Sequence, residues 1–172
     1  MTAEERIFSI VRGGLYAKLP SLALPLGRLT CREGDVDPAG TDGEAAVFAP
    51  GLLRREFLAE SDLPERLTLH LLLHLMLGHP WGRQGRARAL WDTACDLAVG
   101  LVRHALLPQE PETPAAFSAR CKLQARRAVR APAIYALLLE QPDALTAEEQ
   151  AAFYLDDHRL WQLSASASAP KT

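Results

Sequence analysis

The stretch 70–79, with the sequence His-Leu-Leu-Leu-His-Leu-Met-Leu-Gly-His, constrains the fold of this chain more than any other. His70 and His74 are four residues apart in an apolar run, and on an α-helix positions i and i+4 lie on one face, one turn apart. Gly78 suits the position that follows the last residue of a helix, and the proline two residues later prevents continuation. We therefore predict a central helix over 64–77.

Two imidazoles presented on one face of a helix can bind a single zinc ion. His79 adds a third imidazole just beyond the helix end, where the chain can turn back toward the same face. Three protein ligands and an open position for water are typical of catalytic zinc sites. The alternative is that the histidines are core residues whose nitrogens find local partners. The residues alone leave both interpretations open.

A second i, i+4 pair, Asp92 and Asp96, lies in a helix that we predict over 89–107. Such a pair is often no more than a solvated acidic face. However, Asp96 stands between Cys95 and Leu97 in a mostly apolar segment, where a carboxylate usually needs a partner. It could ligate a metal or accept the free N–H of a ligand histidine.

Near the C-terminus, Asp156, Asp157 and His158 form another polar group, followed by Trp161. This group is either the polar end of a helix or a contribution to the histidine site. In the second case we expect His158 or Asp157 to reach the central helix.

The remaining pattern predicts a mostly helical α+β fold. Weak strands are predicted over 27–33 and 44–48, separated by a Gly-, Asp- and Pro-rich loop over 34–43. Further helices are predicted over 3–12 (ended by Gly13-Gly14), 52–59, 115–129, 133–140 and 146–154, the last with a capping box at Thr146 and Glu149. We expect one domain over 1–163 and a disordered Ser/Ala tail over 164–172.

Composition argues against nucleic acid and membrane partners. The net charge is −2, and the basic segment 120–130 lacks interleaved aromatic residues. The apolar run 67–77 is too short to span a bilayer. Three widely spaced cysteines without a C-x-x-C and the lack of a signal-type apolar core after the N-terminus lead us to expect a cytoplasmic protein.

Four stretches carry a family resemblance, in order along the chain. They are Thr-Asp-Gly with Phe-Ala-Pro at 41–50, the histidine stretch 70–79, Trp-Asp-Thr-Ala-Cys-Asp at 91–96, and Asp-Asp-His with a tryptophan at 156–161. They resemble, respectively, the T-D-G…x-N-P, H-E-x-x-H-x-x-x-G-H, W-N-x-A-x-D and D-D-H-x-x-W motifs of a bacterial zincin-like metallopeptidase domain. That domain usually precedes a von Willebrand factor A-like domain.

The resemblance implies a zincin-like α+β fold, with a small N-terminal β-hairpin or sheet packed on a helical bundle that carries the histidine helix. It also implies zinc as the cofactor, with His70 and His74 as ligands. Further ligand candidates are His79, Asp96 and His158. Asp92 and Asp157 are expected to contact ligand residues rather than the metal.

This sequence departs from the family motifs at three positions. Leu71 stands where the motif has its catalytic glutamate, and Ala49 and Asp92 stand where the motifs have asparagine. The glutamate accepts a proton from the attacking water and passes it to the leaving amine, and such acid–base groups contribute roughly 10²–10⁴-fold in rate. A leucine can do neither, so no catalytic residue is assigned.

Three hypotheses follow. The first is a degenerate, zinc-binding metallopeptidase-like domain without peptidase activity, which acts as a binding or scaffolding protein. By analogy with the attached domain, its partner is expected to be a von Willebrand factor A-like protein or an associated ATPase. The second is an active hydrolase with a relocated carboxylate, Asp96 or Asp157. The third is a metal-free structural helical domain.

Overall fold

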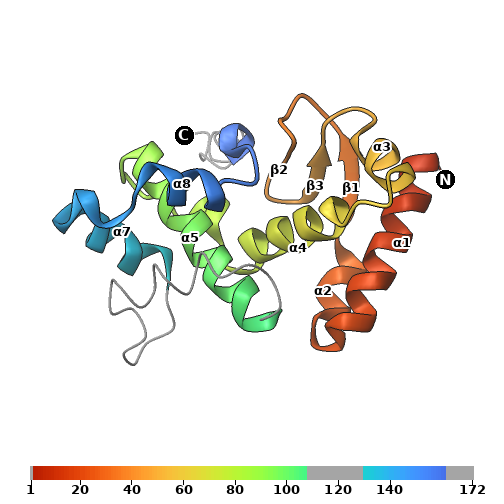
Figure 1. Cartoon of the computed structure of the whole chain (residues 1–172), viewed down its shortest axis with the longest axis horizontal. Coiled ribbons are helices and arrows are strands. Elements are labelled where there is room, and N and C mark those ends of the chain that lie inside the picture. The colour runs from red at the N-terminus through yellow and green to blue at the C-terminus, as the bar shows by residue number, and fades with distance from the viewer. Residues whose placement is uncertain (1, 108–129, 162–172) are drawn as a thin grey trace, which may run out of the picture. The chain divides into compact units, whose positions relative to one another are not determined.

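The computed structural model describes residues 2–107 and 130–161, which divide into two compact units. The first comprises residues up to Trp81 together with the segment from Asp156 onward, and the second comprises Gly82–Leu155. Figure 1 shows the elements of both. The expected single domain over 1–163 stays a prediction, and the expected tail over 164–172 lies outside the described residues.

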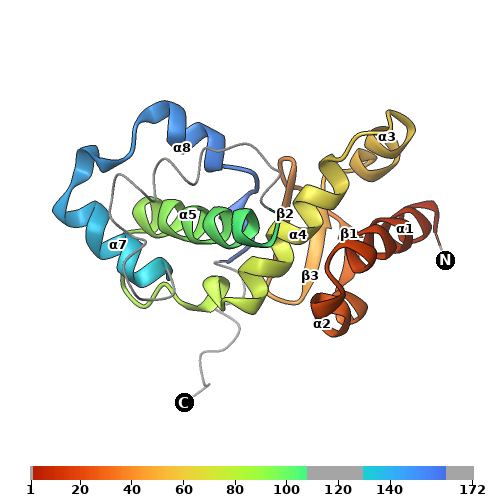
Figure 2. The same cartoon turned by 60° about the horizontal axis from the view of Figure 1, so that its bottom comes forward.

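The first unit combines helices with a small three-stranded sheet. The sheet has the order β1-β3-β2, with β1 parallel and β2 antiparallel to the central β3. Helix α4 packs along β2 and β3 (Figure 2), and α1 packs on α3 and α4. The elements are α1 (Ala3–Lys18), η1 (Pro20–Leu22), α2 (Ala23–Arg28), β1 (Thr30–Glu33), β2 (Ala39–Thr41), β3 (Ala45–Phe48), α3 (Leu52–Leu58), α4 (Leu63–Met76), η2 (His79–Trp81) and η4 (His158–Leu160).

The first helix is longer than predicted, because Gly13-Gly14 does not end it. A glycine inside a helix costs roughly 0.5–1 kcal/mol relative to alanine. Continuing the helix buries Leu15 on the stripe that begins with Ile7 and Phe8, and burial of a leucine contributes about 1.5–3 kcal/mol. Gly14 also leaves room for the Glu65 carboxylate, which a Cβ at this position would meet.

The predicted loop over 34–43 contains a strand, β2, that the sequence analysis did not identify. Gly40 of this strand pairs with Val47 of β3. At its end, the Thr41 hydroxyl donates a hydrogen bond to the Ala45 carbonyl over 2.8 Å, and the Asp42 carboxylate accepts the Ala45 amide over 2.9 Å. These bonds close a β2–β3 hairpin, whose turn contains Asp42 and Gly43. The Gly-, Asp- and Pro-containing residues 34–38 connect β1 to β2.

The segment after Asp156 returns to the edge of β2. The Asp157 amide donates to the Ala39 carbonyl over 2.7 Å, and Asp157 forms a parallel bridge with Gly40. A Cβ at Gly40 would lie 2.5 Å from the Asp157 carbonyl oxygen. This approach therefore requires glycine, and it fixes the Asp156–His158 segment beside the first unit's sheet.

Helix α4 lies almost where the sequence predicts it. Gly78 follows with φ of +71°, the left-handed conformation that ends helices. Its side chains over Leu67–His74 are all buried, polar ones included. The histidines thus lie within an apolar interior rather than on a solvated face.

The second unit is helical in its described part. It contains α5 (Arg88–Leu106), α7 (Ala131–Glu140), η3 (Pro142–Ala144) and α8 (Ala147–Phe153). Helix α5 packs on α7 and α8, and Gly100 lets the Phe153 ring approach its backbone. The capping box of Thr146 and Glu149 is confirmed. The helix predicted over 115–129 falls outside the described residues.

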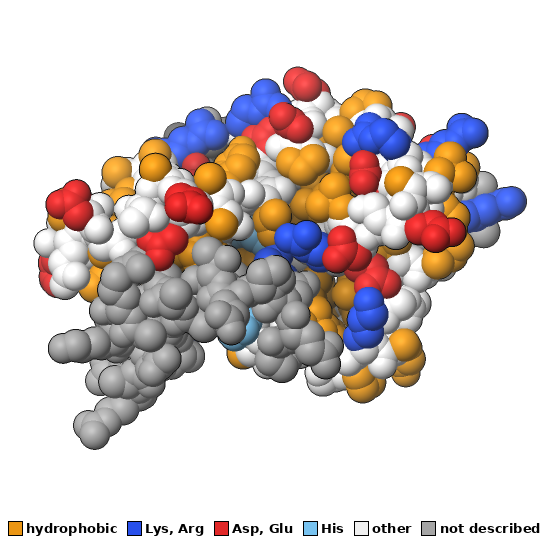
Figure 3. Space-filling view, in the orientation of Figure 1, with side chains coloured by type: hydrophobic (Ala, Val, Ile, Leu, Met, Phe, Trp, Pro, Cys, Tyr) orange, Lys and Arg blue, Asp and Glu red, His pale blue; other side chains and the backbone are white. Residues whose placement is uncertain are grey.

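The predicted α+β class, mostly helical with a small N-terminal sheet, is confirmed. Whether the fold is a zincin stays a prediction. Among the described residues, every helix is too short or too polar to cross a membrane. On the face shown in Figure 3, basic and acidic side chains are interspersed, in keeping with the small net charge.

Candidate metal centre

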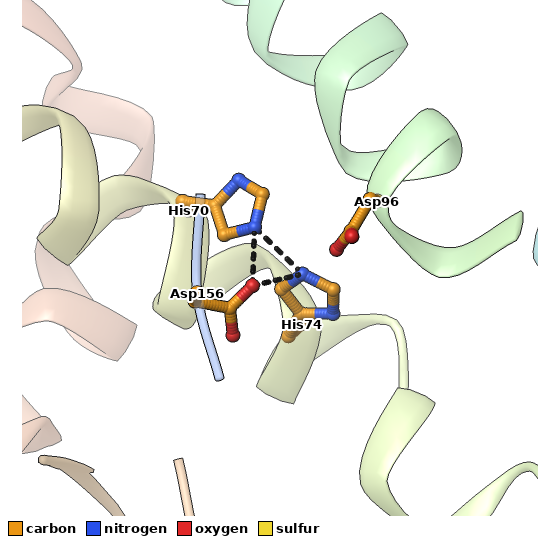
Figure 4. Close-up of side chains that lie close together, drawn as sticks. All are labelled: His70, His74, Asp96 and Asp156. Carbon is orange, nitrogen blue, oxygen red and sulfur yellow. Dashed lines mark hydrogen bonds and ion pairs between the residues drawn. The ribbon is translucent and has the colours of Figure 1, made fainter. Parts of the chain in front are cut away.

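Helix α4 presents two imidazoles toward one point. The Nε2 atoms of His70 and His74 lie 2.9 Å apart, and both side chains are almost completely buried. The i, i+4 spacing therefore has the spatial consequence that the sequence predicts. Figure 4 shows the two rings on successive turns, with their Nε2 atoms facing the same carboxylate.

That carboxylate belongs to Asp156, from the segment that returns to β2. Its Oδ1 atom lies 2.9 Å from Nε2 of His70 and 3.7 Å from Nε2 of His74. Nε2 of His158 lies 3.0 Å from the same oxygen. Three imidazoles of the first unit thus surround one buried carboxylate oxygen.

The arrangement fits a divalent cation. In a tetrahedral zinc site with Zn–N distances of about 2.0–2.1 Å, ligand atoms lie about 3.3 Å apart. The distances among His70, His74 and Asp156, from 2.9 to 3.7 Å, bracket that value. In addition, Oδ2 of Asp156 is buried and has no hydrogen-bond partner among the described residues. A buried carboxylate oxygen of this kind favours a cation beside it.

Asp156 is ionised in this environment. Burial alone raises the pKa of a carboxyl group, but the effects of His158, His74 and His70 outweigh it and hold the pKa of Asp156 well below its ordinary value. The centre therefore contains a carboxylate, which accepts hydrogen bonds and attracts a cation.

His79 lies beside the centre but on the other side of His74. Its Nδ1 atom is 3.0 Å from Nδ1 of His74, the nitrogen that points away from Asp156. The side chain is buried in η2, immediately after Gly78. The structure thus brings His79 to the histidine cluster as the sequence predicts, next to a ligand candidate; its own role as a ligand stays a prediction.

Trp161 packs against the imidazole ring of His158. The two rings are stacked, with centroids 3.9 Å apart and planes 25° from parallel. The same indole lies 5.1 Å from the His74 ring. The late Asp-Asp-His…Trp stretch thus supplies a carboxylate, an imidazole and the aromatic side chain that packs against both histidines.

Asp157, the residue singled out from the sequence, faces Arg159 instead. Its Oδ2 atom accepts a hydrogen bond from Nε of Arg159 over 2.7 Å and forms an ion pair with Nη2 of Arg159 at 2.6 Å. Burial raises the pKa of Asp157, but hydrogen bonds from Arg159 outweigh it and lower the pKa overall. Asp156 is not among the site residues predicted from the sequence. Alternation in an extended segment could have found it, because side chains two apart, such as Asp156 and His158, lie on one side.

Asp92 and Asp96 belong to α5 in the second unit. Asp92 forms an i, i+4 ion pair with Arg88 at 3.5 Å. Asp96, also drawn in Figure 4, is buried. Within their own unit both line a cavity of about 230 Å³, together with Phe153 and other α5 and α8 residues. Their roles at the metal stay predictions.

The chain was compared with known proteins. The model of a family described as "Putative metallopeptidase domain" matches residues 13–155, which is most of the chain. The match includes α4 and the strands that position it. The comparisons with curated proteins and with solved structures gave no match.

Proposed function

Since this chain belongs to the family described as "Putative metallopeptidase domain", we propose that it binds one zinc ion through His70, His74 and Asp156 and does not cleave peptides. The observation that carries the proposal is the convergence of two Nε2 atoms and one carboxylate oxygen at 2.9–3.7 Å in a buried position. Zinc suits a set of imidazole and carboxylate ligands.

Leu71 is the reason to propose an inactive domain. Zinc in a peptidase polarises the substrate carbonyl and acidifies water, but a positioned base must still move the proton. Leu71, directly after the first ligand, is buried and apolar. The carboxylate beside the histidines, Asp156, would itself ligate the ion, so it is not available as that base.

Two residues are candidates for the fourth ligand. His158 has its Nε2 atom 3.0 Å from the Asp156 oxygen. Asp96 is supported by its place at the end of a motif-like stretch on α5. In either case, the protein's role would be binding or scaffolding. A von Willebrand factor A-like protein or an associated ATPase is the partner class that the family resemblance suggests.

The first experiment is to measure the zinc content of the purified, untagged protein by mass spectrometry. We expect about one zinc per chain, lost in a His70→Ala/His74→Ala variant. His104, on α5, is the only histidine outside the stretch 70–79 and the late motif, so His104→Ala is the matched control and should retain the metal. Failure to bind zinc at neutral pH would favour the metal-free hypothesis.

The second experiment tests for catalysis. We expect no peptide hydrolysis by the zinc-loaded wild type, whereas Leu71→Glu restores the missing base and is the variant in which activity could appear. Circular dichroism checks that the buried glutamate is tolerated. Hydrolysis by the wild type that Asp96→Asn abolishes would overturn the proposal in favour of a relocated carboxylate.

A further inference from the structure

Both ring nitrogens of His74 face another imidazole. Nε2 faces His70 at 2.9 Å, and Nδ1 faces Nδ1 of His79 at 3.0 Å. All three rings are buried. Since a neutral imidazole carries one proton, one nitrogen of His74 donates and the other offers a lone pair.

The neighbouring groups decide which nitrogen carries the proton. Nε2 is the nitrogen of His74 that faces Nε2 of His70 at 2.9 Å and Oδ1 of Asp156 at 3.7 Å. It is therefore the nitrogen whose lone pair a cation held by these groups takes. An imidazole that gives its Nε2 lone pair to a cation carries its proton on Nδ1.

A buried N–H needs an acceptor, and for Nδ1 of His74 the atom in place is Nδ1 of His79. We propose that His79 is not a metal ligand but the positioning residue for His74, whose Nδ1–H it accepts, so that Nε2 of His74 is held toward the ion. This inference rests on the zinc binding proposed above. The acceptor for a ligand histidine is more commonly a carboxylate, a carbonyl or water; here an imidazole takes that place.

The turn after α4 brings the acceptor, Nδ1 of His79, next to His74. Gly78 adopts φ of +71°, which an L side chain rarely adopts, and η2 then carries His79 back over the end of the helix. The rings of His74 and His79 meet nearly edge-on, with centroids 5.0 Å apart and planes at 72°. Direct ligation would require His79 to reach the opposite edge of the His74 ring.

Two substitutions of His79 distinguish a hydrogen-bond acceptor from a metal ligand. The side-chain oxygen of asparagine stands close to the place of Nδ1 and can accept the same hydrogen bond, whereas leucine fills the space without an acceptor. We expect the zinc dissociation constant, measured by chelator competition, to stay within about 3-fold in His79→Asn. In His79→Leu it should rise about 10–100-fold, as is typical when such a supporting partner is lost.

A direct ligand gives the opposite pattern. Asparagine is a poor zinc ligand, so His79→Asn and His79→Leu would weaken binding equally, and that result would overturn the inference. His104→Asn and His104→Leu serve as matched controls and should leave the constant unchanged. Thermal melting of each variant shows whether a loss of affinity follows from unfolding.

A measurement on the wild type is independent of zinc affinity. In ¹⁵N-labelled protein, long-range proton–nitrogen correlations report the tautomer of each imidazole. We expect Nδ1–H on His74 and a scalar coupling across the hydrogen bond to Nδ1 of His79, without zinc as well as with it. Absence of zinc binding with this coupling present would reject the proposed function alone. An Nε2–H tautomer on His74 would reject the inference about His79.

Discussion

Helices α4 and α5 each carry two residues of metal-binding type at i and i+4, yet the two pairs differ in what surrounds them. On α4, His70 and His74 are buried, 2.9 Å apart, and face the carboxylate of Asp156. On α5, Asp92 is partly exposed and pairs with Arg88 one turn away.

The difference teaches that i, i+4 spacing places two side chains together but does not by itself make a site. What distinguishes α4 is a third group, a buried carboxylate, which is supplied by a segment far along the chain. Asp156 is 86 residues from His70 in sequence, and it arrives because Asp157 pairs with Gly40 at the edge of β2.

The largest loss of stability should come from removing the carboxylate of Asp156. Asp156→Ala leaves the N–H groups of two buried histidines without their acceptor, so we expect a loss of about 3–5 kcal/mol in the free energy of unfolding. Asp92→Ala removes only a partly exposed ion pair and should cost less than about 1 kcal/mol. Chemical denaturation measures both; equal losses would break the distinction between the two helices.

Zinc should stabilise the folded protein through the histidine pair of α4. With free zinc at 100 times its dissociation constant, binding adds about 2.7 kcal/mol to the free energy of unfolding. A chelator should therefore lower the melting temperature of the wild type and have no effect on His70→Ala/His74→Ala. Calorimetry measures the shift, and a chelator effect that persists in the double variant would place the ion elsewhere.

Disturbing the backbone contact that positions Asp156 should have an intermediate effect on the free energy of unfolding. Gly40→Ala places a methyl group 2.5 Å from the Asp157 carbonyl oxygen, and such overpacking typically costs about 1–3 kcal/mol. Gly27→Ala is the matched control, because a Cβ there meets nothing within 4 Å. Inside α2 this change should raise stability by up to about 1 kcal/mol. Similar losses in both variants would argue against the β2 contact as the cause.

The smallest effect concerns Asp157, which pairs with the exposed Arg159. The pKa of Asp157 is lowered in the folded protein, so the stabilisation is present above the unfolded pKa of about 3.9 and is lost as pH falls through the folded value. We expect Asp157→Asn to cost about 0.5–1 kcal/mol at pH 7 and the difference from wild type to shrink below pH 4. A difference that grows on acidification would contradict this sign.

Local signals predicted much of this fold. The apolar run with Gly78 gave α4, and Thr146 with Glu149 gave the start of α8, since a helix and its caps depend on neighbours in sequence. The end of α1 was predicted wrongly because burial of Leu15 outweighs two glycines. Strand β2 was not predicted, because it forms by pairing with β3 and its own residues do not favour a strand.

The candidate site likewise contains residues that local sequence signals predict and residues that depend on contacts between distant segments. His70 and His74 follow from spacing within one helix. Asp156 could not be chosen over Asp157 without knowing that the segment is extended and pairs with Gly40. The orientation of His79 toward Nδ1 of His74, rather than Nε2, depends on the turn at Gly78, whose geometry no spacing rule specifies.

The bridge between Gly40 and Asp157 has a consequence for the order of events during synthesis. At about 5–20 residues per second, the 86 residues from His70 to Asp156 take a ribosome roughly 4–17 seconds to translate. Throughout that interval the nascent chain carries both histidines without their carboxylate, and the edge of β2 is open to other strands. An ion that needs all three groups can therefore bind only after Asp156 has been translated. A fragment released before that point does not retain the ion.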